Sequence, residues 1–205
     1  MNEKLLIIGA GGHGKVIADI ALKMNKWRNI AFLDDNENVG SVMGLEVLGT
    51  SNTLINYIDH YQIFIGIGDN MTRQKIHMML EAAGANIPTL IHPNSTIGNE
   101  VYIGNGTAIM AGTVINCCTK IGKGCIINTG SKIDHDNHIE DFVHISPGAQ
   151  LAGTVKVGKG TWLGIGSVVI NNVNITANCK IGAAGLVLRD ITEHGTYVGI
   201  PVRRI

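Results

Sequence analysis

The chain has 205 residues, with 16 Lys and Arg residues balanced by 16 Asp and Glu residues, so its formal net charge at pH 7 is zero. This balance favours neither a nucleic acid nor an anionic membrane as a partner. Three Phe, two Trp and four Tyr are too few for the aromatic platforms that bind single-stranded nucleic acids. The apolar run near the N-terminus is too short for a signal peptide or a membrane span. We therefore expect a cytoplasmic protein without a nucleic-acid partner or a membrane span.

The N-terminal part of the chain alternates between strand and helix patterns. Lys4–Ile8 reads as a buried strand running into Gly9–Gly14, and the helix that follows has an apolar face of Val16, Ile17, Ile20, Ala21 and Met24. The further elements expected are strands at 30–33 and 45–48, a short helix at 52–58, a strand at 62–67, a helix at 71–83 capped by Asp69 or Asn70, and a strand at 87–91. This alternation predicts a parallel α/β sheet, so residues 1–90 are predicted to form a small Rossmann-like domain.

A glycine-rich loop follows the first predicted strand. Residues 9–14, GAGGHG, fit the G-x-G-x-x-G pattern, and the acidic pair Asp34-Asp35 begins twenty residues after Gly14. In this pattern glycines let a phosphate approach the backbone at a helix N-terminus, and the acid accepts hydrogen bonds from ribose hydroxyls. The loop predicts a nucleotide-phosphate site that includes Gly12 and His13. The alternative is a tight turn in which the glycines serve packing only.

A second strand-to-helix turn, residues 68–70, is followed by Arg73. Because the carboxyl ends of parallel strands share one edge of a sheet, we expect this turn to face the same nucleotide crevice. Arg73 is then either a phosphate ligand or a solvated charge on its helix. The domain is too small for a complete dinucleotide site and suits one nucleoside diphosphate, such as the UDP of an activated sugar.

From residue 91 to residue 187 an Ile, Leu or Val recurs at every sixth position. A six-residue period fits neither an α-helix nor plain strand alternation, and it is the hexapeptide repeat of a parallel β-helix. Residues 91–192 are therefore predicted to form a β-helix of about six coils with three hexads per coil, followed by a tail at 193–205. The residue four positions after each aliphatic one is usually small and is predicted to point inward. The aliphatic positions are Ile91, Ile97, Ile103, Ile109, Ile115, Ile121, Ile127, Ile133, Ile139, Ile145, Leu151, Val157, Leu163, Val169, Ile175, Ile181 and Val187.

All four cysteines lie within the repeat. Cys117 and Cys118 are adjacent, which suits neither a zinc site nor an ordinary disulfide, while Cys125 and Cys179 occupy the small inward position. We expect four reduced cysteines.

One hexad of the repeat is strongly polar. Residues 133–138, IDHDNH, place His135 at a turn, where side chains point outward, with Asp136 beside it. An imidazole next to a carboxylate is typical of a general base that accepts a proton from an amine or hydroxyl. His138 is the second candidate base. The alternatives are a solvent-exposed polar turn and a mononuclear metal site formed by His135, Asp136 and His138.

Taken together, these motifs resemble those of a known family. The GAGGHG loop, the LDD strand end, the IGDN turn, the unbroken hexapeptide repeat and the terminal segment 198–204 resemble the nucleotide-sugar and sialic acid O-/N-acetyltransferases. The resemblance is greatest to the UDP-4-amino-sugar N-acetyltransferases of bacillosamine-type synthesis, and it covers essentially the whole chain. It implies a left-handed β-helix, a nucleotide-sugar substrate, and acetyl-CoA as co-substrate with no permanently bound cofactor or metal. It also implies a homotrimer with active sites at subunit interfaces.

The resemblance implies roles for individual residues as well. His135 matches the catalytic base, and Asp136 matches the acid beside it, which is usually Glu in the relatives. His144 matches a contact to acetyl-CoA near its thioester, and Gly153 matches a backbone donor to the carbonyl oxygen. The positions that match the pantetheine groove are Ile165, Gly182 and Ala183, and those that match the sugar-nucleotide crevice are Gly12, His13, Asp34, Asp35, Gly68, Asn70 and Arg73.

The expected function is therefore acetyl-CoA-dependent N-acetylation of a nucleotide-linked, UDP-4-amino sugar by direct transfer, with His135 as base. O-acetylation of sialic acid or another sugar hydroxyl is the alternative within the family, and a non-catalytic nucleotide-binding scaffold is the alternative of another class. A mechanism with Cys117 or Cys118 as an acyl-carrying nucleophile lacks an evident base in the sequence.

Overall fold

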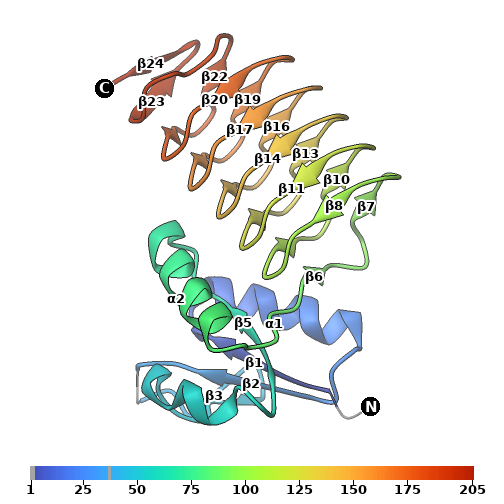
Figure 1. The fold of residues 1–205 in the computed structure, drawn as a ribbon, viewed down its shortest axis with the longest axis vertical. Coiled ribbons are helices and arrows are strands. Elements are labelled where there is room, and N and C mark those ends of the chain that lie inside the picture. Colours follow the sequence, from blue (N-terminus) through green and yellow to red (C-terminus); the bar gives the residue numbers. More distant parts are fainter. Residues whose placement is uncertain (1–2, 37) are drawn as a thin grey trace. The chain divides into compact units, whose positions relative to one another are not determined.

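The computed structural model describes residues 3–36 and 38–205. It divides into two compact units, Met1–Pro93 and Asn94–Ile205. Figure 1 shows the first unit as a small α/β fold and the second as a stack of regular coils.

The N-terminal unit is built on a three-stranded parallel sheet with the order β2-β1-β5. Ile8 at the end of β1 pairs with Leu33 of β2 and with Ile65 of β5, so all three carboxyl ends lie at one edge. The predicted parallel α/β sheet is thereby confirmed. The elements in chain order are β1 (Lys4–Ile8), α1 (Gly12–Met24), β2 (Asn29–Leu33), β3 (Ser41–Val42), β4 (Leu45–Glu46), the 3₁₀ helix η1 (Ser51–Tyr57), β5 (Gln62–Ile65), α2 (Asn70–Ala82) and β6 (Leu90–Ile91).

The core of this unit forms because the strands are apolar on both faces, as a parallel sheet covered by helices requires. The last four residues of β1 are at most 3 % exposed. Helix α1 adds Ile17 and Ile20 to the buried set, and α2 adds Leu80. Of the two predicted caps for α2, Asp69 is the one used: its Oδ1 accepts a hydrogen bond from the Thr72 backbone N–H at 2.9 Å.

Several predicted boundaries in this unit are wrong. The strand expected at 87–91 is reduced to β6, because Pro88 has no N–H to give to a ladder. The strand expected at 62–67 ends at Ile65, where Gly66 packs closely against Gly14. The strand expected at 45–48 is shortened to β4, which pairs in a hairpin with β3, and the short helix at 52–58 is the 3₁₀ helix η1. Val16, predicted on the buried face of α1, is 40 % exposed.

The second unit is the predicted β-helix. Each hexad forms a two-residue strand ending on its aliphatic residue, and each strand pairs in parallel with the strand one coil later, as Ile115 pairs with Ile133. Ladder bonds between coils, such as Asn116 N–H to the Ile133 carbonyl at 2.9 Å, satisfy the backbone along the tube. Every aliphatic position from Ile109 to Val187 is at most 3 % exposed, so the prediction of an aliphatic core is confirmed.

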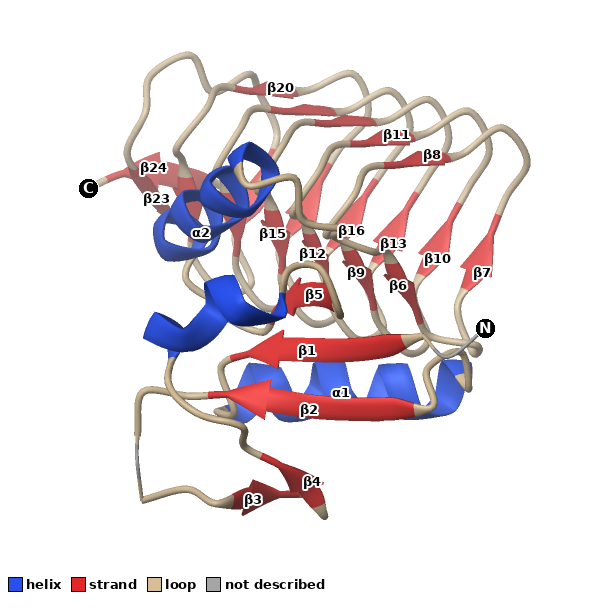
Figure 2. Ribbon diagram, turned by 60° about the horizontal axis from the view of Figure 1, so that its bottom comes forward, coloured by secondary structure: helices blue, strands red, loops and turns tan. Residues whose placement is uncertain are grey.

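The strands form three flat faces, named here after their middle strands. Figure 2 shows β8, β11 and β20 on one side of the coils and β7, β10, β13 and β16 on another. The β13 face contains β7 (Thr96–Ile97), β10 (Val114–Ile115), β13 (Lys132–Ile133), β16 (Gln150–Leu151), β19 (Val168–Val169) and β22 (Leu186–Val187). The β14 face contains β8 (Tyr102–Ile103), β11 (Lys120–Ile121), β14 (His138–Ile139), β17 (Lys156–Val157) and β20 (Asn174–Ile175). The β15 face contains β9 (Ala108–Ile109), β12 (Ile126–Ile127), β15 (His144–Ile145), β18 (Trp162–Leu163) and β21 (Lys180–Ile181).

The tail closes the β15 face. Strand β23 (Thr196–Gly199) pairs in parallel with β21, and β24 (Val202–Arg204) turns back on β23 as an antiparallel hairpin. All four cysteines are free; Cys125 and Cys179 are buried, as predicted for the inward position, while Cys117 and Cys118 are exposed. Within the described part of the chain, no helix has the length and apolar character needed to cross a membrane.

Candidate active site

The glycine loop after β1 meets the turn after β5 at the carboxyl edge of the sheet. A Cβ on Gly14 would lie 1.8 Å from the Gly9 carbonyl oxygen, and a Cβ on Gly66 would lie 2.9 Å from the Gly14 Cα. Only glycines allow the two loops to approach so closely. Gly12, in contrast, has open space where its side chain would be. The last glycine of the motif therefore serves packing, while the open N-terminal turn of α1 leaves its backbone accessible to an anion.

His13 at the start of α1 lies beside Arg73 of α2. The pKa of His13 is lowered to about 4, first by burial and then by the positive charge of Arg73, so its ring is neutral at pH 7. Its Nε2 is buried and has no hydrogen-bond partner among the described residues. Arg73 is 1 % exposed and donates to the Gly68 carbonyl at 2.9 Å and to Asn70 Oδ1 at 2.6 Å. Arg73 is thus a buried cation that organises the turn after β5, not a solvated helix charge.

Asp34 and Asp35, the two acids predicted to bind a ribose, accept hydrogen bonds from backbone N–H groups. Asp34 Oδ2 accepts from the Ala10 N–H at 2.6 Å and its Oδ1 accepts from the Asn36 N–H at 2.9 Å, so this carboxylate anchors the glycine loop. Asp35 accepts from the Ser51 N–H at 2.8 Å at the start of η1, and hydrogen bonds to Ser51 lower its pKa. The structure therefore brings His13 close enough to Arg73 for its charge to act on the ring, while Asp35 binds the start of η1.

On the β-helix, His135 and Asp136 form a hydrogen-bonded pair at the corner between the β13 and β14 faces. His135 Nδ1 lies 2.7 Å from Asp136 Oδ2, with about half of each side chain exposed. This bond raises the pKa of His135; desolvation opposes the rise, and the charges of Asp134 and Asp136 add to it. Because Nδ1 donates to the carboxylate, Nε2 is the basic nitrogen and is available to a substrate. The shorter Asp side chain thus reaches the imidazole.

Gly153 lies one coil beyond His135 in the same corner. A Cβ on Gly153 would lie 2.6 Å from both Cε1 and Nε2 of His135, well inside van der Waals contact. The imidazole therefore rests against the Gly153 backbone, and the absence of a side chain there determines where the basic nitrogen lies.

An Asn–Asp pair supports the same turn, and sequence reasoning did not select it. Asp134 Oδ1 accepts from Asn116 Nδ2 at 2.7 Å and from the His135 N–H at 2.9 Å. Asn116 precedes Asp134 by one coil, eighteen residues, so the coil length is the signal that could have identified this contact.

A groove of about 490 Å³ lies along the β15 face and its next corner. It brings together four of the five residues predicted to contact acetyl-CoA, namely His144, Ile165, Gly182 and Ala183. The rings of His144 and Trp162 are stacked with centroids 5.6 Å apart, and Trp162 Nε1 donates to Ser146 Oγ at 2.7 Å. Trp162 was missed because the hexad pattern assigns it only an outward strand position. Gly153, the fifth residue, lies at the His135 corner instead.

The protonation of His144 follows from its neighbour Asn128. Asn128 Oδ1 accepts from the Thr129 N–H at 2.8 Å, which orients the amide so that Nδ2 faces His144 Nε2 at 3.2 Å. His144 Nε2 must then accept a hydrogen bond, and a neutral ring carries its proton on Nδ1.

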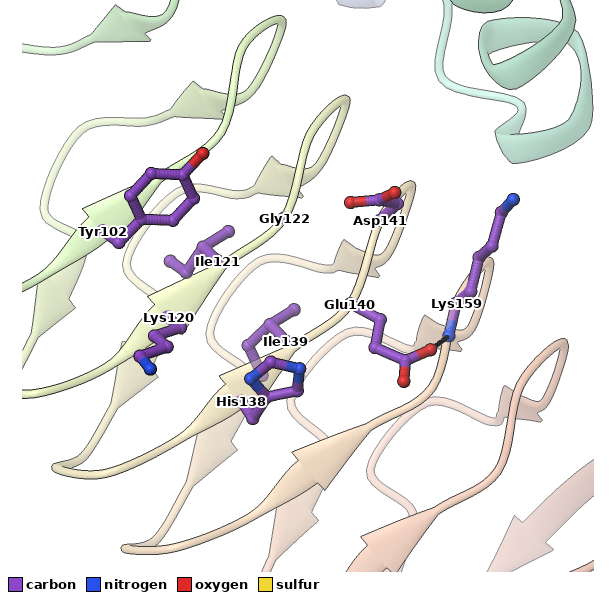
Figure 3. Close-up of a pocket in the computed structure, with 9 residues that line it drawn as sticks. All are labelled: Tyr102, Lys120, Ile121, Gly122, His138, Ile139, Glu140, Asp141 and Lys159. Carbon is purple, nitrogen blue, oxygen red and sulfur yellow. Dashed lines mark hydrogen bonds between the residues drawn. The ribbon is translucent and has the colours of Figure 1, made fainter.

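The second candidate base, His138, lies in a different environment. Figure 3 shows it pointing outward from β14 beside a hollow of about 290 Å³. The acids nearby bind backbone groups: Glu140 Oε2 accepts from the Lys159 N–H at 2.7 Å, and Asp141 Oδ1 accepts from the Lys123 N–H at 2.9 Å. Over residues 3–36 and 38–205, no carboxylate hydrogen-bonds the His138 ring and no group of three His, Cys, Asp or Glu side chains is arranged to hold a metal ion. His138 thus lacks the acid partner that His135 has.

Cys118, one of the two exposed thiols, is a poor nucleophile. The pKa of Cys118 is raised, first by desolvation and then by Cys117 and the carboxylates of Glu100 and Asp136. A thiol that stays protonated at neutral pH does not favour an acyl-carrying role.

Comparisons with known proteins identify relatives in sequence and in fold. The family model of the PglD N-terminal domain matches residues 4–80. A GDP-perosamine N-acetyltransferase from Escherichia coli is 30 % identical over 173 residues, which is 82 % of this chain and 78 % of the relative. The acetyltransferase domain of PglB from Neisseria gonorrhoeae, also solved with acetyl coenzyme A, is 36 % identical over the whole of both chains with a TM-score of 0.96. PerB from Caulobacter crescentus, solved with CoA and GDP-perosamine, is 34 % identical, covers 100 % of this chain and 98 % of its own, and gives a TM-score of 0.93.

The hexapeptide β-helix that follows a small α/β unit, together with these relatives, identifies the chain as an acetyltransferase. The chain belongs to the nucleotide-sugar N-acetyltransferases with a left-handed β-helix. The predicted family, fold class and enzyme class are confirmed.

Proposed function

We propose that this enzyme transfers the acetyl group of acetyl-CoA to the amine of a nucleotide-linked 4-amino sugar, with UDP as the expected nucleotide. The observation that carries the proposal is the His135–Asp136 pair, whose Nδ1 is occupied by the carboxylate and whose Nε2 is left as an exposed base. The relatives named as GDP-perosamine N-acetyltransferases support an amino sugar as acceptor. The choice of UDP rests on the resemblance of the motifs at residues 9–14 and 68–70 to those of the UDP-4-amino-sugar N-acetyltransferases.

His135 accepts the proton of the attacking amine. The amine nitrogen forms a bond to the thioester carbonyl carbon as its proton moves to His135 Nε2, and the C–S bond then breaks to release the CoA thiolate. The imidazolium returns its proton to the thiolate, so one amide and one free thiol result. Asp136 stabilises the imidazolium through its 2.7 Å hydrogen bond, and the Gly153 N–H is the proposed donor to the carbonyl oxygen.

The groove on the β15 face is the proposed acetyl-CoA site. Its walls are largely apolar, which suits a pantetheine arm, and His144 and Trp162 line it. The His135 corner and this groove lie on opposite edges of the β13 face, so one chain does not place its own base in its own groove. A composite site, with the base of one subunit against the groove of another, accounts for this separation. We therefore propose a homotrimer, the assembly that three-sided β-helices of this family imply.

Residues 1–90 are proposed to bind the nucleotide sugar, residues 91–192 to carry out acyl transfer, and residues 193–205 to form a C-terminal tail. The buried Arg73 cation beside the unpartnered Nε2 of His13 fits an anionic diphosphate near Gly12, Gly68 and Asn70. We place the reaction in the cytoplasm, where free thiols such as these four cysteines persist.

The test is release of free CoA thiol from acetyl-CoA with a panel of UDP-4-amino, UDP-3-amino, GDP-4-amino and CMP-sialic acceptors. Turnover with an amino sugar, and its loss by about two to four orders of magnitude in His135→Ala, supports the proposal. Turnover of hydroxyl acceptors alone identifies an O-acetyltransferase, and binding of nucleotide sugars without any turnover identifies a scaffold. The matched control is His138→Ala, which alters an exposed histidine without the acid partner.

Analytical ultracentrifugation tests the assembly separately. A trimer whose activity is restored on mixing an inactive His135→Ala chain with an inactive groove variant supports a composite site, because each chain supplies what the other lacks. A monomer with full activity contradicts it.

A further inference from the structure

The side chains that point into the β-helix beneath the His135 corner form a column with one residue per coil. In chain order these are Val101, Thr119, Asn137, Val155 and Val173. Asn137 is 1 % exposed, so its carboxamide is enclosed by the coils. A buried amide destabilises the fold unless it is hydrogen-bonded, whereas valine at this position needs no partner. Packing alone does not account for an amide here.

One hydrogen bond of Asn137 is common to inward residues of this β-helix. Asn137 Nδ2 donates to the carbonyl of Ala152, fifteen residues later, at 2.9 Å. The inward threonines do the same: Thr161 Oγ1, for example, donates to the carbonyl of Thr176 at 3.0 Å. This bond ties one coil to the next, and a threonine at position 137 would be able to make it.

The other side-chain hydrogen bonds of Asn137 go to the backbone of the turn that carries His135. Nδ2 also donates backwards to the carbonyl of Asp134 at 2.7 Å and to the carbonyl of His135 at 3.3 Å. These carbonyls belong to the peptide groups on either side of the His135 Cα. Ala152, the third acceptor, immediately precedes Gly153, against which the His135 ring rests. One amide therefore holds the turn that carries the imidazole and the turn that supports it.

We infer that Asn137 is a positioning residue of the acetyl-transfer reaction, which fixes the direction of the His135 imidazole by binding the carbonyls of Asp134, His135 and Ala152. This inference rests on the proposed role of His135 as base. Asn137 does not contact a substrate from inside the β-helix, so it acts through the turn.

The amide also carries a cost that points to function rather than stability. Asn137 Oδ1 is buried, and it accepts no hydrogen bond from any residue that the structure describes. Threonine at position 137 would keep the hydrogen bond between the coils and would not bury an unpaired amide oxygen. Folding stability alone therefore favours Thr over Asn. Residues retained against stability are typical of active sites.

The decisive variant is Asn137→Thr, compared with Thr161→Val as a control that removes the same kind of inter-coil bond at another corner. For Asn137→Thr we expect kcat to fall about tenfold, both KM values to stay within about twofold, and the melting temperature to stay equal or rise. For Thr161→Val we expect a lower melting temperature with kcat unchanged. A kcat for Asn137→Thr within about twofold of the wild type, or a fall in kcat that follows the melting temperature in both variants, overturns the inference.

A pH profile separates positioning from general loosening. The charged groups that act on His135 are Asp134 and Asp136 on its own turn, and the thiol of Cys118 on the preceding coil interacts with Asp136. If Asn137→Thr lets the turn relax, the His135–Asp136 bond weakens and the acid limb of kcat/KM moves to lower pH. An unmoved limb overturns the inference. His135→Ala in the same assay distinguishes the two levels: if that variant is fully active, the proposed base is wrong, whereas if it is inactive and Asn137→Thr is unchanged, only the role of Asn137 is wrong.

Discussion

Replacing Gly153 by Ala tests whether the contact between the His135 ring and the Gly153 backbone determines kcat. The added Cβ would lie 2.6 Å from Cε1 and Nε2 of His135, whereas ordinary contact begins at 3.4 Å. The ring must therefore move by about 1 Å, and a misplacement of that size at a reacting group costs about 10²-fold in rate. Alanine keeps the backbone N–H, so the proposed donor to the carbonyl oxygen is retained. The backbone of Gly153 is not in the left-handed region, so the fold should tolerate the change.

The assay is steady-state CoA release, with kcat and both KM values measured for four chains: wild type, Gly153→Ala, His135→Ala and the double variant. We expect kcat of Gly153→Ala to fall about 100-fold, equivalent to about 2.7 kcal/mol, with an unchanged melting temperature. In the His135→Ala background the same substitution should cost less than about twofold, because no ring is left to displace. A full 100-fold loss in that background would show that the methyl group blocks a substrate instead, and a single variant within threefold of wild type would refute the argument from geometry.

Three further changes test other parts of the site. Asp136→Asn removes the carboxylate that raises the pKa of His135, so the acid limb of kcat/KM should move to lower pH and kcat should fall about tenfold or more; a stationary limb speaks against Asp136 as the partner. Trp162→Ala removes the stacked wall beside His144, and the KM for acetyl-CoA should rise several-fold while the KM for the sugar nucleotide stays constant; the opposite pattern would assign the groove to the sugar. His13, with its pKa lowered from 6.5 to about 4, binds fewer protons when folded than when unfolded, so stability should fall as pH decreases from 6.5 towards 4. In urea denaturation at pH 7 and pH 5, His13→Asn should lose part of that pH dependence, and an equal loss of stability in both proteins would contradict the buried neutral ring.

The β-helix was predictable from the sequence because its rule is local. Each hexad places one aliphatic residue inside the tube, so the pattern is visible without knowing which distant segments pack together. The N-terminal unit was predicted less well, since the ends of its strands depend on single residues such as Pro88 and on contacts such as Gly66 against Gly14. Periodicity carries no information about such endings.

Contacts of the candidate site were predicted where the two residues are neighbours in the sequence. They were missed where the two residues lie on consecutive coils and are far apart in the sequence. His135 and Asp136 are neighbours in sequence, so their pairing was visible. Asn116 and Asp134 are eighteen residues apart and meet only because one coil has that length. The stack of Trp162 on His144 has the same origin. For Asp34, the sequence showed the acid after β2 but not that the Ala10 N–H already uses one of its oxygens.

The architecture separates stability from chemistry by the direction of each side chain. Outward corner residues such as His135 and Asp136 touch little of the aliphatic core, so their replacement should lower activity and leave the melting temperature nearly unchanged. Inward aliphatic residues such as Ile133 should do the reverse, since a cavity in a tightly packed tube costs about 2–5 kcal/mol for a change to Ala while the corner backbone stays in place. Asn137 belongs to neither class: it points inward but binds the backbone of the base. Substitution of Ile133 by Ala should therefore cost stability and substitution of His135 by Ala should cost activity, whereas Asn137 is the inward position at which Asn137→Thr costs activity.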